Sequence, residues 1–305
     1  MNLDDLDLLF KDALRSLSPN DFINHIEKAL DYYQVLSFDF ERGSVFWRAR
    51  KIESNFYKHI DDLNYPPKHL VNCGRINDKE SPFFYLSSRR ETALAEINSK
   101  ENDIIQLAGF KIKDNENLRI AVVGEFWNVF KTGYLKFLGQ DPKGCINRLI
   151  NSPSKNLAKN LIYIDKYFSE ILADTKALEN EYLFTRTLSN KLLKKAHTEA
   201  IAYPSVKDPG AYNLAVEANK SDIVFENVMC LTLKIESIKK WGIYDYRILS
   251  AAEGIDESGN FIWHKETEFT KTPIYNLTKY EMDKLTKINN ADLSHFNSVY
   301  KADNY

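Results

Sequence analysis

Polar side chains that could do chemistry interrupt three otherwise apolar parts of the sequence. A segment that alternates like a strand carries Arg48 and Arg50, and a predicted helix carries Glu96 at the flank of its apolar stripe. Further along, Ser205 ends one apolar segment and Asn213 lies inside the next. If these segments converge, arginines able to bind an anion would meet a carboxylate able to stabilise positive charge.

Each of these residues also has a purely structural explanation. Arg48 or Arg50 could form a buried ion pair, Glu96 could face water, and Ser205 could be a turn residue after proline. The combination indicates a binding site better than any single residue does. A carboxylate, two or three arginines, a tyrosine and a serine would share one aromatic-walled cleft.

Common catalytic and metal-binding motifs are absent from the sequence. There is no G-x-G-x-x-G, P-loop, H-E-x-x-H or G-x-S-x-G pattern. The six histidines are scattered without ligand spacing, so no metal site is expected. The three cysteines, Cys73, Cys145 and Cys230, are isolated and odd in number, which excludes a regular disulfide framework.

Hydrophobic spacing predicts the elements that must position the polar set. Residues 1–40 are predicted to form a helical hairpin whose second helix begins at Ser18-Pro19. Ser88 and Glu91 form a capping-box pattern at the start of the helix that carries Glu96. Strands and helices mix without strict βαβ alternation, which predicts an α+β fold. The other predicted elements are strands at 44–50, 83–87, 104–113, 118–123 (joined to the preceding strand across 114–117), 200–203, 211–216 and 228–235, helices at 156–173 and 180–195, and a hairpin of 244–255 with 261–264.

Length and charge narrow the class of protein. The chain has 305 residues and a net charge of -2, so it can bury a real core but lacks the net-basic character of many nucleic-acid-binding proteins. No apolar run approaches the roughly 18 residues that a membrane span needs. The acidic N-terminus has no secretory pattern, and the isolated cysteines fit a reducing cytoplasm, which is the expected location.

Six segments, in order over about residues 44–226, resemble the RES domain, a family named for its Arg, Glu and Ser. They are Trp47-Arg-Ala-Arg50, Gly74-Arg-Ile-Asn77, Phe84-Tyr-Leu-Ser87, Glu91-Thr-Ala-Leu-Ala-Glu96, Tyr203-Pro-Ser205 and Asn213-Leu214. One departure is Ile76, where many members have Trp or Phe. Another is length, because the N-terminal hairpin and the tail beyond about 240 exceed a minimal RES domain.

The resemblance implies a fold similar to diphtheria-toxin-type ADP-ribosyltransferases and NAD as the substrate. Family members degrade NAD by phosphorolysis or hydrolysis, often as the toxin of a pair with a DNA-binding antitoxin. Matched by position, the resemblance implies catalytic roles for Glu96, Arg75 and Ser205, and NAD-binding roles for Arg48, Arg50, Tyr85 and Asn213.

These residue types suit cleavage of the bond between nicotinamide and ribose. The leaving pyridinium becomes neutral, so no general acid is needed, and a single carboxylate, Glu96, can stabilise the oxocarbenium-like ribose. Arg48 and Arg75, and less directly Arg50, can bind the diphosphate in fork geometry. Tyr85 can stack on a flat ring, and Ser205 can hydrogen-bond the ribose or position Glu96.

We therefore expect an N-terminal helical appendage at 1–42, a RES-like catalytic domain at 43–240, and a C-terminal hairpin and tail packed on the core at 241–305. The expected activity is NAD cleavage, with phosphate or water as acceptor and no prosthetic group, in a growth-inhibiting toxin with a possible antitoxin partner. We expect no direct binding to nucleic acid or membrane. Alternatives are an ADP-ribosyltransferase acting on a macromolecule, a catalytically inactive RES-like binding or regulatory protein, or a non-catalytic α+β protein. The N-terminal helices could cover the cleft or bind a neutralising partner.

Overall fold

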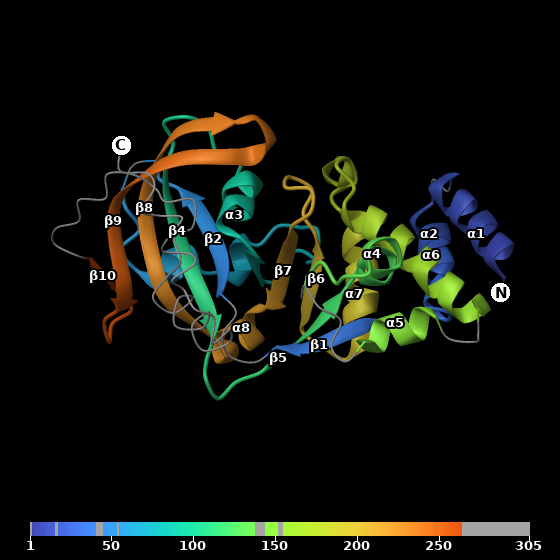
Figure 1. The fold of residues 1–305 in the computed structure, drawn as a ribbon. Helices are drawn as coiled ribbons and strands as arrows, with labels where there is room; N and C mark the ends of the chain where they lie inside the picture. Colours follow the sequence, from blue (N-terminus) through green and yellow to red (C-terminus); the bar gives the residue numbers. More distant parts are fainter. Residues whose placement is uncertain are drawn as a thin grey trace.

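A computed structural model describes residues 2–15, 18–40, 45–53, 55–137, 144–151 and 155–263. Within them the fold is mixed α/β and is built on one sheet (Figure 1). The ten strands of this sheet, in spatial order, are β1 (Leu36–Phe40), β5 (Leu118–Val122), β6 (Ala200–Pro204), β7 (Tyr212–Glu217), β3 (Phe83–Ser87), β2 (Val45–Lys51), β4 (Ile104–Ile112), β8 (Phe225–Lys239), β9 (Ile243–Ile255) and β10 (Phe261–Trp263). Of the described pairs, β5 with β6 is parallel and the others are antiparallel.

Helices pack mainly at the β1–β5–β6 end of this sheet (Figure 1). The α-helices among the described residues are α1 (Leu3–Arg15), α2 (Pro19–Leu30), α3 (Arg90–Glu96), α4 (Glu125–Thr132), α5 (Cys145–Ile150), α6 (Lys155–Leu172), α7 (Leu183–Ala196) and α8 (Ala218–Val224). Helix α3 is separate from the larger helical group and lies against β2 and β3 near the middle of the sheet. It is short and directly follows β3, so the end of β3 fixes where α3 lies.

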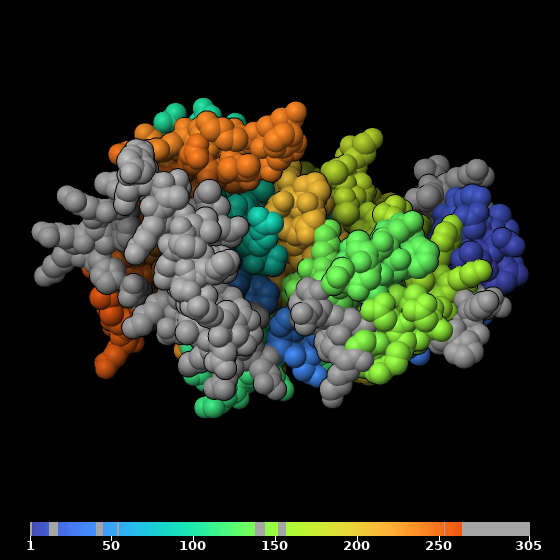
Figure 2. All heavy atoms as spheres, viewed as in Figure 1, coloured from blue at the N-terminus to red at the C-terminus, as the bar shows by residue number. Residues whose placement is uncertain are grey.

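The two N-terminal helices are part of the main core. Leu6, Phe10, Phe22 and Ile26 are buried in the same apolar cluster as residues of α6 and α7. The Phe10 ring stacks on that of Tyr167, with centroids 3.8 Å apart. In space, helices α1 and α2 form one end of the molecule, and the β8–β9 hairpin lies toward the other end (Figure 2).

A buried carboxylate joins the end of this N-terminal region to the helical layer. Asp165 of α6 accepts hydrogen bonds from the Tyr33 hydroxyl at 2.6 Å and from the backbone N–H groups of Gly124 at 2.9 Å and Trp127 at 3.0 Å. The two backbone donors belong to the start of α4, so Asp165 caps that helix from outside. Burial raises the pKa of the Asp165 carboxyl to about 6.

The helical prediction for residues 1–40 was wrong at its end. Residues Leu36–Phe40 form the edge strand β1, which pairs antiparallel with β5, Leu36 lying opposite Val122. The sequence Leu-Ser-Phe-Asp-Phe has the period of two that is typical of a half-buried strand. The two predicted helices are confirmed as α1 and α2.

A further local prediction, the Ser88 cap, was wrong because long-range pairing decided it. Helix α3 has Arg89, not Ser88, at its N-cap, without a side-chain cap. Ser88 instead continues the β3–β7 ladder: its N–H donates to the Tyr212 carbonyl at 3.0 Å. The predicted strands at 104–113 and 118–123 are confirmed as β4 and β5, which take separate places in the sheet: β4 lies between β2 and β8, and β5 between β1 and β6.

The predicted C-terminal hairpin is confirmed as far as the structure describes it, with Phe261 opposite Ile255. Predictions that concern 43–44 and 264–305 lie outside the described residues. Among the described helices, none is long and apolar enough to cross a membrane. The described residues also contain no group of three or more His, Cys, Asp or Glu side chains placed to hold a metal ion.

Candidate active site

A cavity of about 190 Å³ lies where β7, β3 and β2 run side by side and α3 packs against them. Four of the seven predicted site residues line it: Arg48, Tyr85, Glu96 and Asn213. Trp47 and Tyr203 supply aromatic walls. The sheet brings these residues together because strands distant in sequence are neighbours in space, as when Ser87 of β3 pairs with Asn213 of β7.

Glu96 is the last residue of α3, and one of its two carboxylate oxygens is held by two donors. Oε1 accepts a hydrogen bond from Ser205 Oγ at 2.6 Å and another from Asn213 Nδ2 at 2.6 Å. Within the described residues the other oxygen, Oε2, accepts none. The carboxylate is therefore oriented through one oxygen, which leaves the second able to act on a molecule in the cavity.

The two donors to Glu96 are themselves fixed. Ser205 Oγ accepts from the backbone N–H groups of Lys207 at 3.2 Å and Asp208 at 3.0 Å, so its own proton points to Glu96. Asn213 Oδ1 accepts from Ser87 Oγ at 2.8 Å. The carboxylate decides which side of the amide faces it, because the reversed amide would place two oxygens together, and the Ser87 hydroxyl then donates to the remaining amide oxygen.

Arg48 is the cation of the cavity. Its Nη1 donates to the Tyr85 carbonyl at 2.9 Å, and its guanidinium lies over the Phe84 ring, 5.5 Å from the centroid. Within the part of the chain that the structure describes, its buried Nε has no hydrogen-bond partner. Burial, and to a lesser extent the charge of Arg50, lowers the pKa of Arg48 to about 9. The group is still mainly protonated at neutral pH, and an anion in the cavity would satisfy its spare donors.

Tyr85 lines the cavity, but its hydroxyl is engaged elsewhere. The hydroxyl donates to Asn77 Oδ1 at 2.7 Å and accepts from the Ile76 N–H at 3.1 Å, and burial raises its pKa. These bonds hold the turn that Gly74 and Asn77 close, with Gly74 N–H donating to the Asn77 carbonyl at 2.9 Å. A side chain at position 74 would collide with Asn77 and the Tyr85 hydroxyl, which explains the glycine.

Two predicted arginines do not line the cavity in this structure. Arg75 Nη1 donates to the carbonyls of Leu172 at 2.7 Å and Asp174 at 3.0 Å, at the C-terminal end of α6, where cations are favoured. Arg50 Nη2 donates to the Asn64 carbonyl at 3.0 Å, and burial lowers its pKa. Both bond to backbone carbonyls of other segments, and their roles toward NAD stay predictions.

Several residues that complete the site were not predicted as members. Ser87 and Tyr203 lie inside the quoted motifs, so the motifs carried a signal, but only the sheet register showed what these side chains contact. Arg90 is buried, with its guanidinium 4.2 Å from the centroid of the Trp47 ring, a cation–π arrangement that supports one wall of the cavity.

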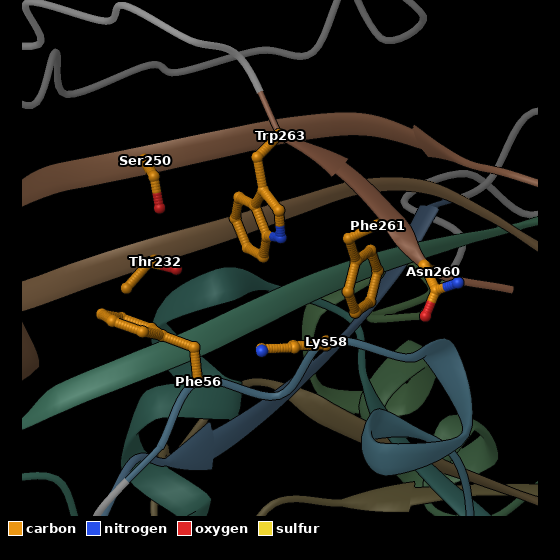
Figure 3. A pocket seen from close by; sticks show the side chains of 7 residues that line it. All are labelled: Phe56, Lys58, Thr232, Ser250, Asn260, Phe261 and Trp263. Atoms are coloured by element: carbon orange, nitrogen blue, oxygen red, sulfur yellow. The ribbon is translucent and has the colours of Figure 1, made fainter.

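A larger cavity of about 440 Å³ lies elsewhere, against β8, β9 and β10 (Figure 3). Phe56, Phe261 and Trp263 form its walls, and Lys58 extends between them. Its lining, as far as the described residues show it, contains no carboxylate and none of the seven predicted residues. Size therefore does not identify the active site here, and the smaller cavity with Glu96 and Arg48 is the candidate.

The chain matches a known protein family. A family model described as the RES domain matches residues 45–228, more than half of the chain. The chain belongs to the RES family. The RES match begins at the first residue of β2 and ends within β8, so it contains every residue of the cavity described above.

The remaining comparisons are more distant. A solved chain from the MbcT–MbcA toxin–antitoxin complex of M. tuberculosis is similar to this RES protein with a TM-score of 0.34 and 9% sequence identity. The similarity covers 68% of this chain and 91% of that chain. No curated protein matches the sequence.

Proposed function

We propose that this RES protein cleaves the N-glycosidic bond between nicotinamide and ribose in NAD and passes the ADP-ribosyl group to phosphate or water. The observation that carries the proposal is one oriented carboxylate, Glu96, sharing a small aromatic-walled cavity with the incompletely bonded guanidinium of Arg48. Membership of the RES family supports NAD as the substrate, because RES toxins act on NAD.

In this mechanism Glu96 acts on charge that exists mainly in the transition state. The nicotinamide leaves as a neutral molecule, so the site needs no acid, and positive charge develops on the ribose at C1′. The free oxygen of Glu96 stabilises that charge, and the bonds from Ser205 and Asn213 to the other oxygen hold the carboxylate in place. A single carboxylate suffices, unlike the pair that ordinary glycosidases use.

The size of the cavity limits which part of NAD it encloses. At about 190 Å³ it is smaller than the ~300–1,000 Å³ of ordinary ligand pockets, so it fits the nicotinamide and its ribose rather than the whole dinucleotide. Trp47, Tyr85 and Tyr203 offer flat apolar surfaces for the nicotinamide ring. Arg48 is suited to an anion beside the ribose, either the near phosphate of NAD or an attacking phosphate ion.

The proposed fold relationship and biological role follow from the family. We place the chain with diphtheria-toxin-type ADP-ribosyltransferases in fold and with growth-inhibiting toxins in role, acting on the NAD of its own cytoplasm. A toxin of that kind needs a neutralising protein, and a cognate antitoxin is the partner we propose.

Purified full-length protein incubated with NAD, with and without phosphate, tests the proposal. ADP-ribose-1″-phosphate as product indicates phosphorolysis, free ADP-ribose indicates hydrolysis, and labelled protein or nucleic acid indicates transfer to a macromolecule. If nicotinamide is not released under any of these conditions, the chain is not an NAD-cleaving enzyme.

A further inference from the structure

A second hydrogen bond joins α3 to the turn that carries Ser205, one helical turn away from the bond made by Glu96. Thr92 and Glu96 are four residues apart and therefore lie on the same face of α3. Thr92 is fully buried, and its Oγ1 donates to Asp208 Oδ2 at 2.6 Å. The helix is thus attached to the 205–208 turn at two points, Thr92–Asp208 and Glu96–Ser205.

Asp208 also holds the turn together internally. Its backbone N–H donates to Ser205 Oγ at 3.0 Å, and its carbonyl accepts from the Ala211 N–H at 3.0 Å. The same residue therefore binds the helix through its side chain and orients the Ser205 hydroxyl through its backbone. Any shift of Asp208 relative to α3 would change the bond between Ser205 and Glu96.

We propose that Thr92 and Asp208 are positioning residues for NAD cleavage, which set the distance and direction of the Ser205–Glu96 bond. This inference rests on the proposed function of Glu96. Neither residue lines the cavity, so their effect passes through Ser205 and Glu96 rather than through contact with substrate. A displacement of about 1 Å at a reacting group lowers a rate by up to ~10²-fold, so a small loosening of the turn has a measurable effect.

The deciding experiment compares Thr92→Val with Thr92→Ser in the full-length chain. Valine keeps the shape of threonine without the hydroxyl, whereas serine keeps the hydroxyl. Thr185→Val is the matched control, because Thr185 is equally buried and donates to the Tyr182 carbonyl at 3.0 Å on α7. Two quantities are measured for each variant: the steady-state constants for NAD cleavage, and the hydrogen-exchange rate of the Asp208 amide.

Thr92→Val is expected to lower kcat about tenfold while KM for NAD stays within about twofold of wild type. The Asp208 amide should exchange at least about tenfold faster in Thr92→Val, because the turn opens more often. Thr92→Ser should recover most of kcat and of the exchange protection, and Thr185→Val should change neither quantity.

The two readouts separate failure of this inference from failure of the proposed function. Unchanged kcat and unchanged Asp208 exchange in a folded Thr92→Val protein would overturn the positioning role. An equal loss of kcat in Thr185→Val would overturn it too, since general destabilisation would then explain the effect. If wild-type protein does not cleave NAD, the proposed function fails. In that case, faster Asp208 exchange in Thr92→Val would show only that the Thr92–Asp208 bond stabilises the turn. The role in catalysis would be overturned together with the proposed activity.

Discussion

Replacing Glu96 by glutamine removes a charge from the candidate site while keeping its shape. The glutamine carbonyl can accept from Ser205 and Asn213 as Oε1 does now, which leaves an uncharged amide NH₂ facing the cavity. The network around residue 96 is therefore expected to persist in the variant. What is lost is the attraction between the carboxylate and the positive charge that develops on the ribose.

Coulomb's law gives the size of that loss for a ribose in contact with the carboxylate. A full positive charge about 4 Å from a carboxylate gains about 4 kcal/mol at an effective dielectric constant of about 20. The ribose carries only part of a charge in the transition state, so about 3–4 kcal/mol, or a ~10²–10³-fold loss of kcat, is expected. KM should change little, because the interaction is made in the transition state rather than in the bound substrate.

The assay is nicotinamide release, measured alongside NAD binding and thermal unfolding so that a folding defect is recognised. Glu91→Gln is the control on the same helix. Glu91 pairs only loosely with Arg89, at 3.7 Å and partly exposed, so this change should cost about 1 kcal/mol of stability or less and leave kcat intact. Wild-type kcat in a folded Glu96→Gln protein would refute the electrostatic role of Glu96.

Three further outcomes are expected. Arg48→Ala should raise KM for NAD or for phosphate about tenfold. Arg48→Lys should recover only part of this loss, because lysine lacks the forked guanidinium donors of arginine. Unchanged KM for both substrates would remove Arg48 from anion binding. Because the folded-state pKa of Asp165 is raised to about 6 from 3.8, its contribution to stability is fully present below about pH 3.8 and falls by about 3 kcal/mol as pH rises from there through 6. Urea unfolding should show that fall in wild type, and its persistence in Asp165→Asn would contradict the assignment. Induced expression should lower cellular NAD and stop growth, and Glu96→Gln should abolish both effects. Normal NAD levels in cells with abundant folded wild-type protein would count against a toxin role, unless a co-expressed antitoxin is found bound to the protein.

The N-terminal helices bear on that cellular test. Helices α1 and α2 pack on α6 and α7, and neither contributes to the lining of the cavity that contains Glu96. In this structure they therefore do not cover the site, so the full-length chain is the appropriate protein to express. Removing α1 and α2 would also expose the apolar core residues that Leu6 and Phe22 now cover.

The sequence by itself determined the local elements and the identity of the central residues. Amphipathic periodicity located α6 and α7, and alternating apolar residues located most strands, because both patterns depend on neighbours a few residues away. The ordered motifs also indicated Glu96, Ser205 and Asn213, which the structure does bring together.

Only the tertiary structure decided which groups meet. Ser87 touches Asn213, 126 residues away, and Thr92 touches Asp208, 116 residues away, because β3 pairs with β7 and α3 packs beside the turn after β6. The β3–β7 pairing also places Ser88 in a strand ladder rather than at a helix cap. Packing against α6 places Arg75 at the end of that helix, bonded to the Leu172 carbonyl. Hydrogen bonds across a sheet join residues by register rather than by spacing in the chain, so no local pattern encodes them.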